Sequence, residues 1–538
     1  MTVTDTDAPS QVTSDTVPAL TPPEPATGFA ALLGTSDHTT IGRLYIGTSF
    51  VFLFVAVVTG MLLSIERIDV SGIDVLDADV VAQLFSVFRI SSVFLFLVPL
   101  LLGLALCVVP RQVGSPTVAF PRAAAASYWT YLIGGGIILA SVIADGGPGG
   151  GDPDAVALFV AATIMVLVAL GLAAVCVATT GLALRTEGMS VRRTPLFTWA
   201  NVVAAGLWIL TLPVLAGILL LAYVDLRYGP TLIGSGDQLF LRMAWVWSQP
   251  SNYVFVIPVL GIIADISSVA ARTRFTQHRL AMGCIGAFAV FSFGVWAMPS
   301  WAPTTDGDLL LAYTDEVPFV VASFLVVVPL LALAGLVAGT LRRGAARLIS
   351  PLVWALAALV MLLAGAANGA LVSIDPLDLV NTTATTAQIH YVLGAGLLGA
   401  LGGLVYWSPV IFRRAFPELA STGLAGLGLV GTVLLCLPDL ISGFVGQLAR
   451  LGGAPGDASS GEVDAIEAFN LVSTIGAAVL ALVAVGFLGL LVRTVAGKDE
   501  VVDPWEGNTL EWATSDDLPE IMSEAPVYDA RHAAEVAS

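Results

Sequence analysis

The side chain best suited to hold a redox metal in this sequence is His390, in the segment of residues 385–391 (T-T-A-Q-I-H-Y). It is one of four histidines, and the only one inside a long apolar stretch. A neutral imidazole is a common ligand of haem iron and of copper, because it brings no charge into an apolar site. One imidazole supplies one ligand, so a chain with a single buried histidine has little with which to hold a metal.

The four cysteines do not extend this ligand set. All of them lie in apolar stretches, and no two have the C-x-x-C spacing of a thiolate metal site. We expect them to be small core residues rather than partners in disulfides. The formal net charge of −18 argues against nucleic-acid binding.

The amino-acid composition indicates that these residues belong to a membrane protein. The chain has 538 residues, of which 57% are hydrophobic and only 12% charged, so it is expected to be an integral membrane protein. Crossing a hydrocarbon core of roughly 30 Å takes about 20 helical residues, and apolar runs of that length recur along the chain. The pattern predicts an all-α bundle of twelve transmembrane helices between residues 41 and 496. The predicted spans are residues 42–64, 85–109, 125–146, 155–184, 196–224, 243–268, 280–299, 317–341, 348–373, 389–411, 421–445 and 466–494.

The two ends of the chain are polar and are expected to lie outside the membrane. Residues 1–40 are rich in Thr, Asp and Pro near the start and lack a signal-peptide core, which predicts a disordered cytoplasmic tail. Residues 497–538 are predicted to form an acidic cytoplasmic tail. The loops on the side of the termini carry most of the arginines, so the positive-inside rule places both termini in the cytoplasm. We expect the membrane to be a cytoplasmic membrane of the prokaryotic type.

Arg89 is the only cation predicted within the first half of a span. A charge in the hydrocarbon region usually has a partner or a function. Because Arg89 lies close to the start of its helix, we favour the interpretation that its guanidinium reaches back to the outer interface.

Several segments resemble subunit I of the haem–copper oxidases, the cytochrome c oxidase family, in order and over nearly the whole chain. Residues 118–122 (V-A-F-P-R) and 127–129 (S-Y-W) resemble that family's A-F-P-R and S-Y-W positions. Residues 185–200 resemble its M-R-A-P-G-M loop followed by P-L-F-x-W-A, and residues 503–512 (D-P-W-E-G-N-T-L-E-W) resemble its D-P-W-x-x-x-T-L-E-W tail. The resemblance implies the twelve-helix fold of that subunit.

The resemblance also implies a low-spin haem, a high-spin haem and a copper ion held by six histidines, but five of those positions hold other residues here. The second-helix histidine corresponds to Phe88, and the family's H-P-E-V-Y appears as residues 249–253 (Q-P-S-N-Y). The histidine pair of V-W-A-H-H corresponds to Met298 and Pro299. In the family's H-F-H segment the first histidine corresponds to Gln388 and the second to His390. The positions that have lost a ligand are therefore Phe88, Gln249, Met298, Pro299 and Gln388.

These replacements favour a catalytically degenerate subunit, a pseudoenzyme that keeps the fold and lacks the copper and high-spin haem sites. We expect no copper and, on this hypothesis, no haem. The surface segments it shares with the family predict contacts with other membrane subunits that resemble oxidase subunits II or III, or with a larger respiratory redox complex in the lipid bilayer.

Two alternatives remain open. The chain could be an electron-transfer or oxidase subunit that retains one haem at His390. The emptied cavity could instead bind a quinone, a lipid or another small ligand, with Gln249, Tyr253, Met298 and Gln388 lining the pocket. If His390 holds no haem, it is expected to hydrogen-bond to a backbone carbonyl or to Thr386.

Overall fold

The computed structural model describes residues 28–70, 76–148, 151–229, 253–297, 317–380, 382–449, 458–507 and 509–513. Among these residues the regular elements are helices, in agreement with the predicted all-α class. The chain divides into two compact units, residues 1–35 and residues 36–538. The first unit contains the short helix α1 (Gly28–Leu33), which lies in the segment predicted to be a disordered tail.

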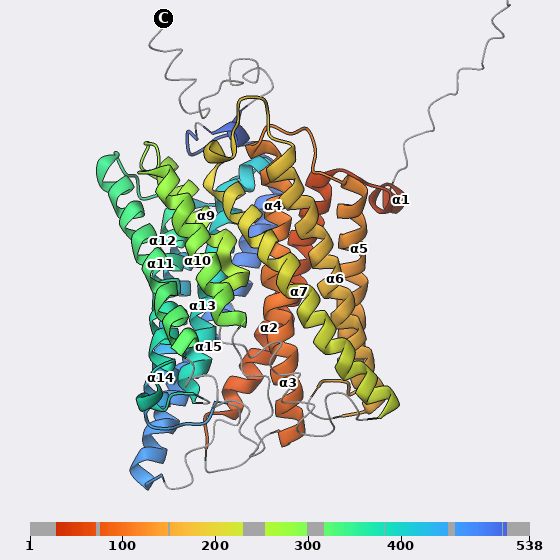
Figure 1. Ribbon diagram of the computed structural model, residues 1–538, viewed down its shortest axis with the longest axis vertical. Helices are drawn as coiled ribbons and strands as arrows, with labels where there is room; N and C mark the ends of the chain where they lie inside the picture. The colour runs from red at the N-terminus through yellow and green to blue at the C-terminus, as the bar shows by residue number, and fades with distance from the viewer. Residues whose placement is uncertain are drawn as a thin grey trace, which may run out of the picture. The chain divides into compact units, whose positions relative to one another are not determined.

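The second unit is a bundle of long helices that run side by side (Figure 1). In chain order the helices are α2 (His38–Glu66), α3 (Ala78–Ile90), the π-helix η1 (Ser91–Leu97), α4 (Val98–Gln112), α5 (Pro121–Ile143), α6 (Pro153–Ala183), α7 (Leu196–Tyr228), α9 (Tyr253–Ala270), α10 (His278–Ala297), α11 (Val317–Arg343), α12 (Ser350–Val372), α13 (Thr383–Phe412), α14 (Glu418–Phe444) and α15 (Ser460–Ala496). Short 3-10 turns follow α6, α12 and α15.

Eleven helical segments of the described residues are long and apolar enough to cross a membrane, with α3, η1 and α4 forming one of them. The shorter apolar segment His278–Phe293 in α10 lies where the seventh span was predicted. The twelve-helix architecture is therefore confirmed in outline, and the protein is an integral membrane protein. Helix α2 begins at His38, a few residues before the predicted start of the membrane domain.

A π-helix interrupts the second span between Phe88 and Pro99. Proline has no N–H to give to the carbonyl four residues earlier, and its ring crowds that carbonyl, so the regular hydrogen-bond ladder breaks there. The carbonyl oxygen of Leu95 accepts a hydrogen bond from the Tyr131 hydroxyl at 2.6 Å instead. The extra residue of a π-turn shifts the register of the side chains on either side of it.

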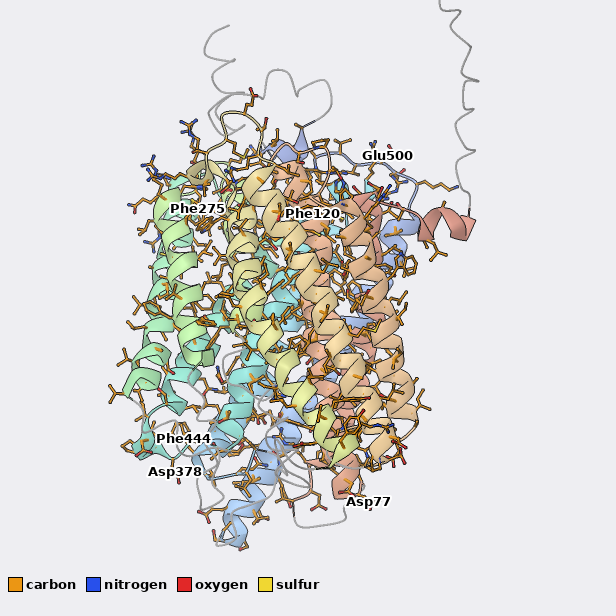
Figure 2. The ribbon with its side chains drawn as sticks, turned by 45° about the vertical axis from the view of Figure 1, so that its right-hand side comes forward. Asp77, Phe120, Phe275, Asp378, Phe444 and Glu500 are labelled. Carbon is orange, nitrogen blue, oxygen red and sulfur yellow. The ribbon has the colours of Figure 1, made fainter. Side chains whose placement is uncertain are left out.

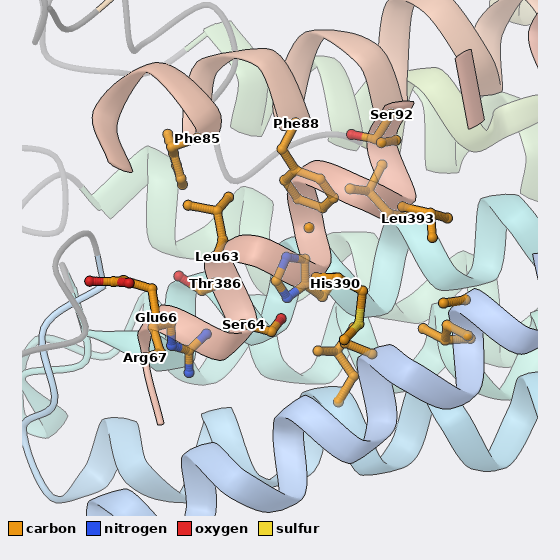
Figure 3. Close-up of a pocket in the computed structure, with 18 of the residues that line it drawn as sticks. Leu63, Ser64, Glu66, Arg67, Phe85, Phe88, Ser92, Thr386, His390 and Leu393 are labelled. Carbon is orange, nitrogen blue, oxygen red and sulfur yellow. The ribbon is translucent and has the colours of Figure 1, made fainter. Parts of the chain in front are cut away.

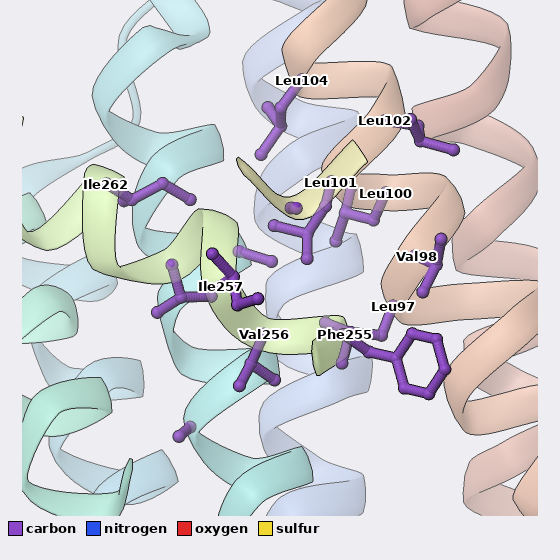
Figure 4. Packing of buried hydrophobic residues seen from close by; sticks show 14 of the residues in the cluster. Leu97, Val98, Leu100, Leu101, Leu102, Leu104, Phe255, Val256, Ile257 and Ile262 are labelled. Atoms are coloured by element: carbon purple, nitrogen blue, oxygen red, sulfur yellow. The ribbon is translucent and has the colours of Figure 1, made fainter. Parts of the chain in front are cut away.

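The same compensation occurs in α9, at the centre of the bundle. Pro258 leaves the carbonyl oxygen of Val254 without its helical donor, and the indole N–H of Trp208 donates to it at 2.7 Å. The side chains of α9 and α4 belong to the same buried hydrophobic cluster, part of which Figure 4 shows with Leu101 and Ile257 labelled. Helices α4, α9 and α13 are almost entirely buried, so they form the core around which the outer helices pack.

The loops gather at two ends of the bundle (Figure 2). Phe120, Phe275 and Glu500 lie at one end, and Asp77 and Asp378 lie at the other. The arginine-rich loops follow α4, α6, α9, α11 and α13, and they share the first end. The site described below lies near the second end.

The described part of the predicted C-terminal tail packs against the first end of the bundle. The indole N–H of Trp505 donates to the backbone oxygen of Tyr406 at 3.1 Å, and that of Trp512 donates to the Tyr406 hydroxyl at 3.2 Å. The Gln112 amide nitrogen donates to Glu511 at 3.1 Å. Because both tryptophans and Glu511 are buried, this segment is part of the folded bundle.

Candidate functional site

His390 lies two turns into α13, and its side chain is only 12% exposed. Its Nδ1 atom lies 3.9 Å from Oδ2 of Asp439 on α14, which is too long for a hydrogen bond but close enough for a charge interaction. This nitrogen is buried and has no hydrogen-bond partner. The expectation that His390 bonds to a backbone carbonyl or to Thr386 is wrong for Nδ1, whose neighbour is a carboxylate.

Asp439 is held by a buried polar network that joins three helices. The Arg67 Nη2 atom, at the end of α2, lies 2.7 Å from Asp439 Oδ1 and 3.1 Å from Asn470 Oδ1 on α15. The side chain of Asp439 is 1% exposed and that of Arg67 is 17% exposed. Asn470 Nδ2 donates back to the Arg67 carbonyl at 2.6 Å. The carboxylate behind His390 is therefore fixed in place and paired.

A cavity of about 430 Å³ lies beside His390. Its walls come from α2, α3, η1, α13, α14 and α15, and they are mainly apolar. In Figure 3 the Phe88 ring of α3 faces His390, with Phe85 one turn away on the same helix and Arg67 toward one end. The Ser64 and Thr386 side chains also line the wall. The arrangement is that of a small-molecule pocket, largely apolar with a few polar groups.

The cavity lies where the resemblance implies a low-spin haem, but its residues do not fit that group. A low-spin haem of this family needs a second axial ligand opposite His390. The Phe88 ring stands there instead, edge-on to the imidazole with 5.8 Å between ring centroids, and a hydrocarbon ring cannot ligate iron. Glu66 and Asp69 place carboxyl groups on the wall of the same cavity.

The positions of the high-spin haem and copper are only partly described. Gln388 Nε2 donates to the Tyr253 hydroxyl at 2.8 Å, and that hydroxyl donates to the backbone oxygen of Gly365 at 3.2 Å. A Cβ atom on Gly369 would overlap the hydroxyl, so the helices approach closely here. Neither Tyr253 nor Gln388 lines the 430 Å³ cavity.

The other proposed members of that pocket, Gln249, Met298 and Pro299, lie outside the described residues. The prediction of a ligand pocket formed by Gln249, Tyr253, Met298 and Gln388 therefore stays a prediction. Within the described ranges, no group of three or more histidine, cysteine, aspartate or glutamate side chains is placed to hold a metal ion.

Arg89 does not reach the outer interface as expected. Its side chain is among the largest that are fully buried, with the residue 1% exposed. Its guanidinium carbon lies 5.2 Å from the Phe85 ring centroid and 5.9 Å from that of Phe88, while Nε and Nη1 have no hydrogen-bond partner. Contact with two aromatic faces offsets part of the desolvation of the charge. The same two rings line the cavity.

The sequence interpretation missed Asp439, although a signal was present. Asp439 is the only acidic residue in the predicted span 421–445, and an ionisable residue inside a span is by default a candidate functional residue. The pairing of Asp439 with Arg67, 372 positions earlier, cannot be deduced from spacing.

The fold is that of an integral membrane protein in which a histidine beside a buried carboxylate lines a cavity between membrane-crossing helices. The family model described as "Cytochrome C and Quinol oxidase polypeptide I" matches residues 40–479. The chain therefore belongs to this family of oxidase subunits, as the motifs predicted.

The relatives found by sequence include bacterial proteins. A Streptomyces avermitilis protein named "Putative cytochrome c oxidase subunit 1-beta" is 31% identical, over 93% of this chain and 92% of its own length. The quinol oxidase subunit 1 of Bacillus subtilis is 27% identical, over 90% of this chain and 76% of its own. A solved haem–copper terminal oxidase dimer has a chain with a TM-score of 0.68 at 12% identity, covering 87% of this chain and 86% of its own. The structural likeness confirms the fold.

Proposed function

We propose that this chain is a catalytically degenerate subunit I that serves as a structural or interaction subunit of a membrane redox complex. The observation that carries the proposal is the Phe88 ring, which stands against His390 where a second haem ligand would have to be. A subunit that binds neither the low-spin haem nor copper has no path for electrons of its own. This chain retains the family-like segments of residues 118–129 and 185–200, and its C-terminal segment packs against the bundle.

The proposed partners are membrane subunits of the kinds that accompany subunit I, resembling oxidase subunits II or III. Long faces of α14 and α15 expose large apolar side chains such as Leu427, Val430, Leu482 and Val485. These faces suit either lipid or an apolar transmembrane partner. Membership of a family of oxidase subunits supports a partner on part of this surface.

We further propose that both termini lie in the cytoplasm of a bacterial cell. The arginine-rich loops and the docked segment around Glu500 share one end of the bundle. The positive-inside rule assigns that end to the cytoplasm. The bacterial source of the relatives supports a prokaryotic cytoplasmic membrane.

The proposal is tested by purifying the tagged full-length chain from its native membranes in mild detergent. Mass spectrometry should find a stoichiometric membrane subunit, and chains purified without that subunit should consume no oxygen with reduced cytochrome c or with quinol. Oxygen consumption by the chain alone, abolished by His390→Ala, would overturn the proposal.

A further inference from the structure

The cavity beside His390 extends along the helices, well beyond the imidazole. On α2 its wall runs from Glu66 to Leu53, which is about 20 Å at a helical rise of roughly 1.5 Å per residue. The hydrocarbon core of a bilayer is roughly 30 Å thick, so an acyl chain in one leaflet spans about 15 Å. The cavity therefore has the depth that one acyl chain needs, measured from the loop end of the bundle.

The deep part of the cavity is apolar and lies within the bundle. Phe96 and Leu97 line it and are 3% and 1% exposed, and Ala484 lines it from α15. A bundle selected only for stability would fill this space with side chains, because an empty cavity loses dispersion contacts. A hydrocarbon chain restores those contacts and brings no polar group that needs a partner. The depth and the lining together favour a chain as the occupant.

The loop end of the cavity carries two charged side chains with unused hydrogen-bonding atoms. Glu66 Oε2 and Arg67 Nε are buried, and neither has a hydrogen-bond partner within the described part of the chain. Both residues line the cavity, and Figure 3 shows them toward one end of it, with Leu393 toward the other. The Nη2 atom of Arg67 is already engaged by Asp439 at 2.7 Å, so Nε is the group left for a ligand. Buried charged groups are costly without partners, so a ligand that supplies both partners is favoured.

The two adjacent opposite charges select a zwitterionic head group. A carboxylate accepts strong hydrogen bonds from a primary ammonium, and a guanidinium N–H donates to a phosphate oxygen. A quaternary ammonium has no N–H to donate to Glu66. A head group that carries only a negative charge would be repelled by Glu66 and by Asp69, which places a second carboxyl group on the wall.

From this geometry we infer that the cavity binds one acyl chain of an aminophospholipid, a bilayer lipid whose head group combines a primary ammonium with a phosphate. The chain lies in the deep apolar part beside Phe96 and Leu97. The ammonium donates to Glu66, and the phosphate accepts from Arg67 Nε. The lipid occupies space where the family resemblance implies a haem, and this site goes beyond the structural role proposed above.

The test uses the full-length protein in lipid nanodiscs that contain a trace of a photoreactive phospholipid. Three probes share the same acyl chains, with a diazirine near the end of one chain, and differ only in an ethanolamine, choline or glycerol head group. After irradiation, mass spectrometry locates the cross-linked residues. The ethanolamine probe should label Phe96 and Leu97 roughly tenfold more than either other probe, as expected for the loss of one charge-assisted hydrogen bond.

Labelling from the surrounding bilayer is measured on the same samples. Val51 and Phe54 on α2 are 59% and 61% exposed, and all three probes should label them equally. The inference is wrong if the three probes label Phe96 and Leu97 equally, or if none labels these two residues.

Two pairs of variants locate the head group and the chain. Glu66→Gln should lower labelling of the deep wall by the ethanolamine probe to the level of the choline probe, while Asp464→Asn, on an exposed residue of α15 outside the cavity, should not. Ala481→Leu narrows the cavity and should lower the same labelling roughly tenfold, the usual size of an overpacking penalty, whereas Ala478→Leu, outside the cavity, should not.

Unchanged labelling of the exposed residues on α2 shows that each variant keeps its fold. A retained ethanolamine preference in Glu66→Gln, or equal labelling of the two alanine variants, would overturn the assignment. Neither result bears on the partner subunits, which the purification tests separately.

Discussion

Replacing Asp439 by asparagine should strongly destabilise the end of the bundle that contains Arg67 and His390. The change keeps the side-chain volume and removes the negative charge that pairs with Arg67 at 2.7 Å and faces His390 at 3.9 Å. Because the Asp439 side chain is 1% exposed and that of Arg67 is 17% exposed, solvent screens the pair weakly. Breaking a buried pair by removing one partner typically costs about 3–5 kcal/mol, mostly because the other charge stays buried and unpaired.

A double-mutant cycle isolates the pair itself. The cycle also needs Arg67→Gln and the double variant. The double variant should lose about 1–3 kcal/mol less free energy of unfolding than the sum of the losses in the two single variants. The assay is unfolding in mixed micelles, followed by the reaction of a fluorescent thiol reagent with the cysteines. All four cysteines are buried and free, so their labelling reports loss of the fold.

The matched control is the exposed pair of Arg272 and Glu506, whose side chains are 49% and 66% exposed. Glu506→Gln should change the free energy of unfolding by less than about 1 kcal/mol, as is usual for surface pairs. If Asp439→Asn were no more destabilising than Glu506→Gln, and the cycle were additive, the network described around His390 would be refuted.

Three further predictions follow from buried polar groups. Burial raises the pKa of Glu511, so ionisation of this carboxyl destabilises the folded state. Stability should therefore fall as pH rises from the ordinary glutamate pKa through the raised value, and Glu511→Gln should flatten this slope in thermal unfolding measured as a function of pH. Arg89→Met removes a fully buried guanidinium and should leave the protein at least as stable in the same unfolding assay. The reason is that the desolvation cost of the charge outweighs its contact with aromatic rings, which is worth about 2 kcal/mol at most. A loss of unfolding free energy above that size would mean that Arg89 has an anionic partner. Tyr253→Phe removes the hydrogen bonds to Gln388 and Gly365 and should cost about 1–2 kcal/mol in the same unfolding assay, and an unchanged stability would show that these bonds contribute nothing.

The fold was largely accessible from the sequence, because span length and motif order are local properties. Twelve apolar runs predicted twelve helical segments, and alignment of Phe88 with a ligand position predicted the loss of a haem partner. The partner of His390 was not accessible in this way. Asp439 comes from another helix, and its direction depends on how α13 and α14 pack.

The environment of Arg89 shows a second limit. Its distance from the helix start predicted a side chain that reaches solvent, but the local π-helix and the packing of the bundle bury it between phenylalanine rings. Snorkelling requires a free path to the interface. Whether that path exists depends on neighbours that are distant in sequence.

The central claim is that the residues at the low-spin haem position no longer hold haem. The direct measurement is the visible absorption spectrum of the purified full-length protein, with haem and copper quantified per chain. The account predicts no Soret band and no stoichiometric copper, in wild-type protein and in His390→Ala alike. A Soret band with one haem per chain, lost on His390→Ala, would contradict it.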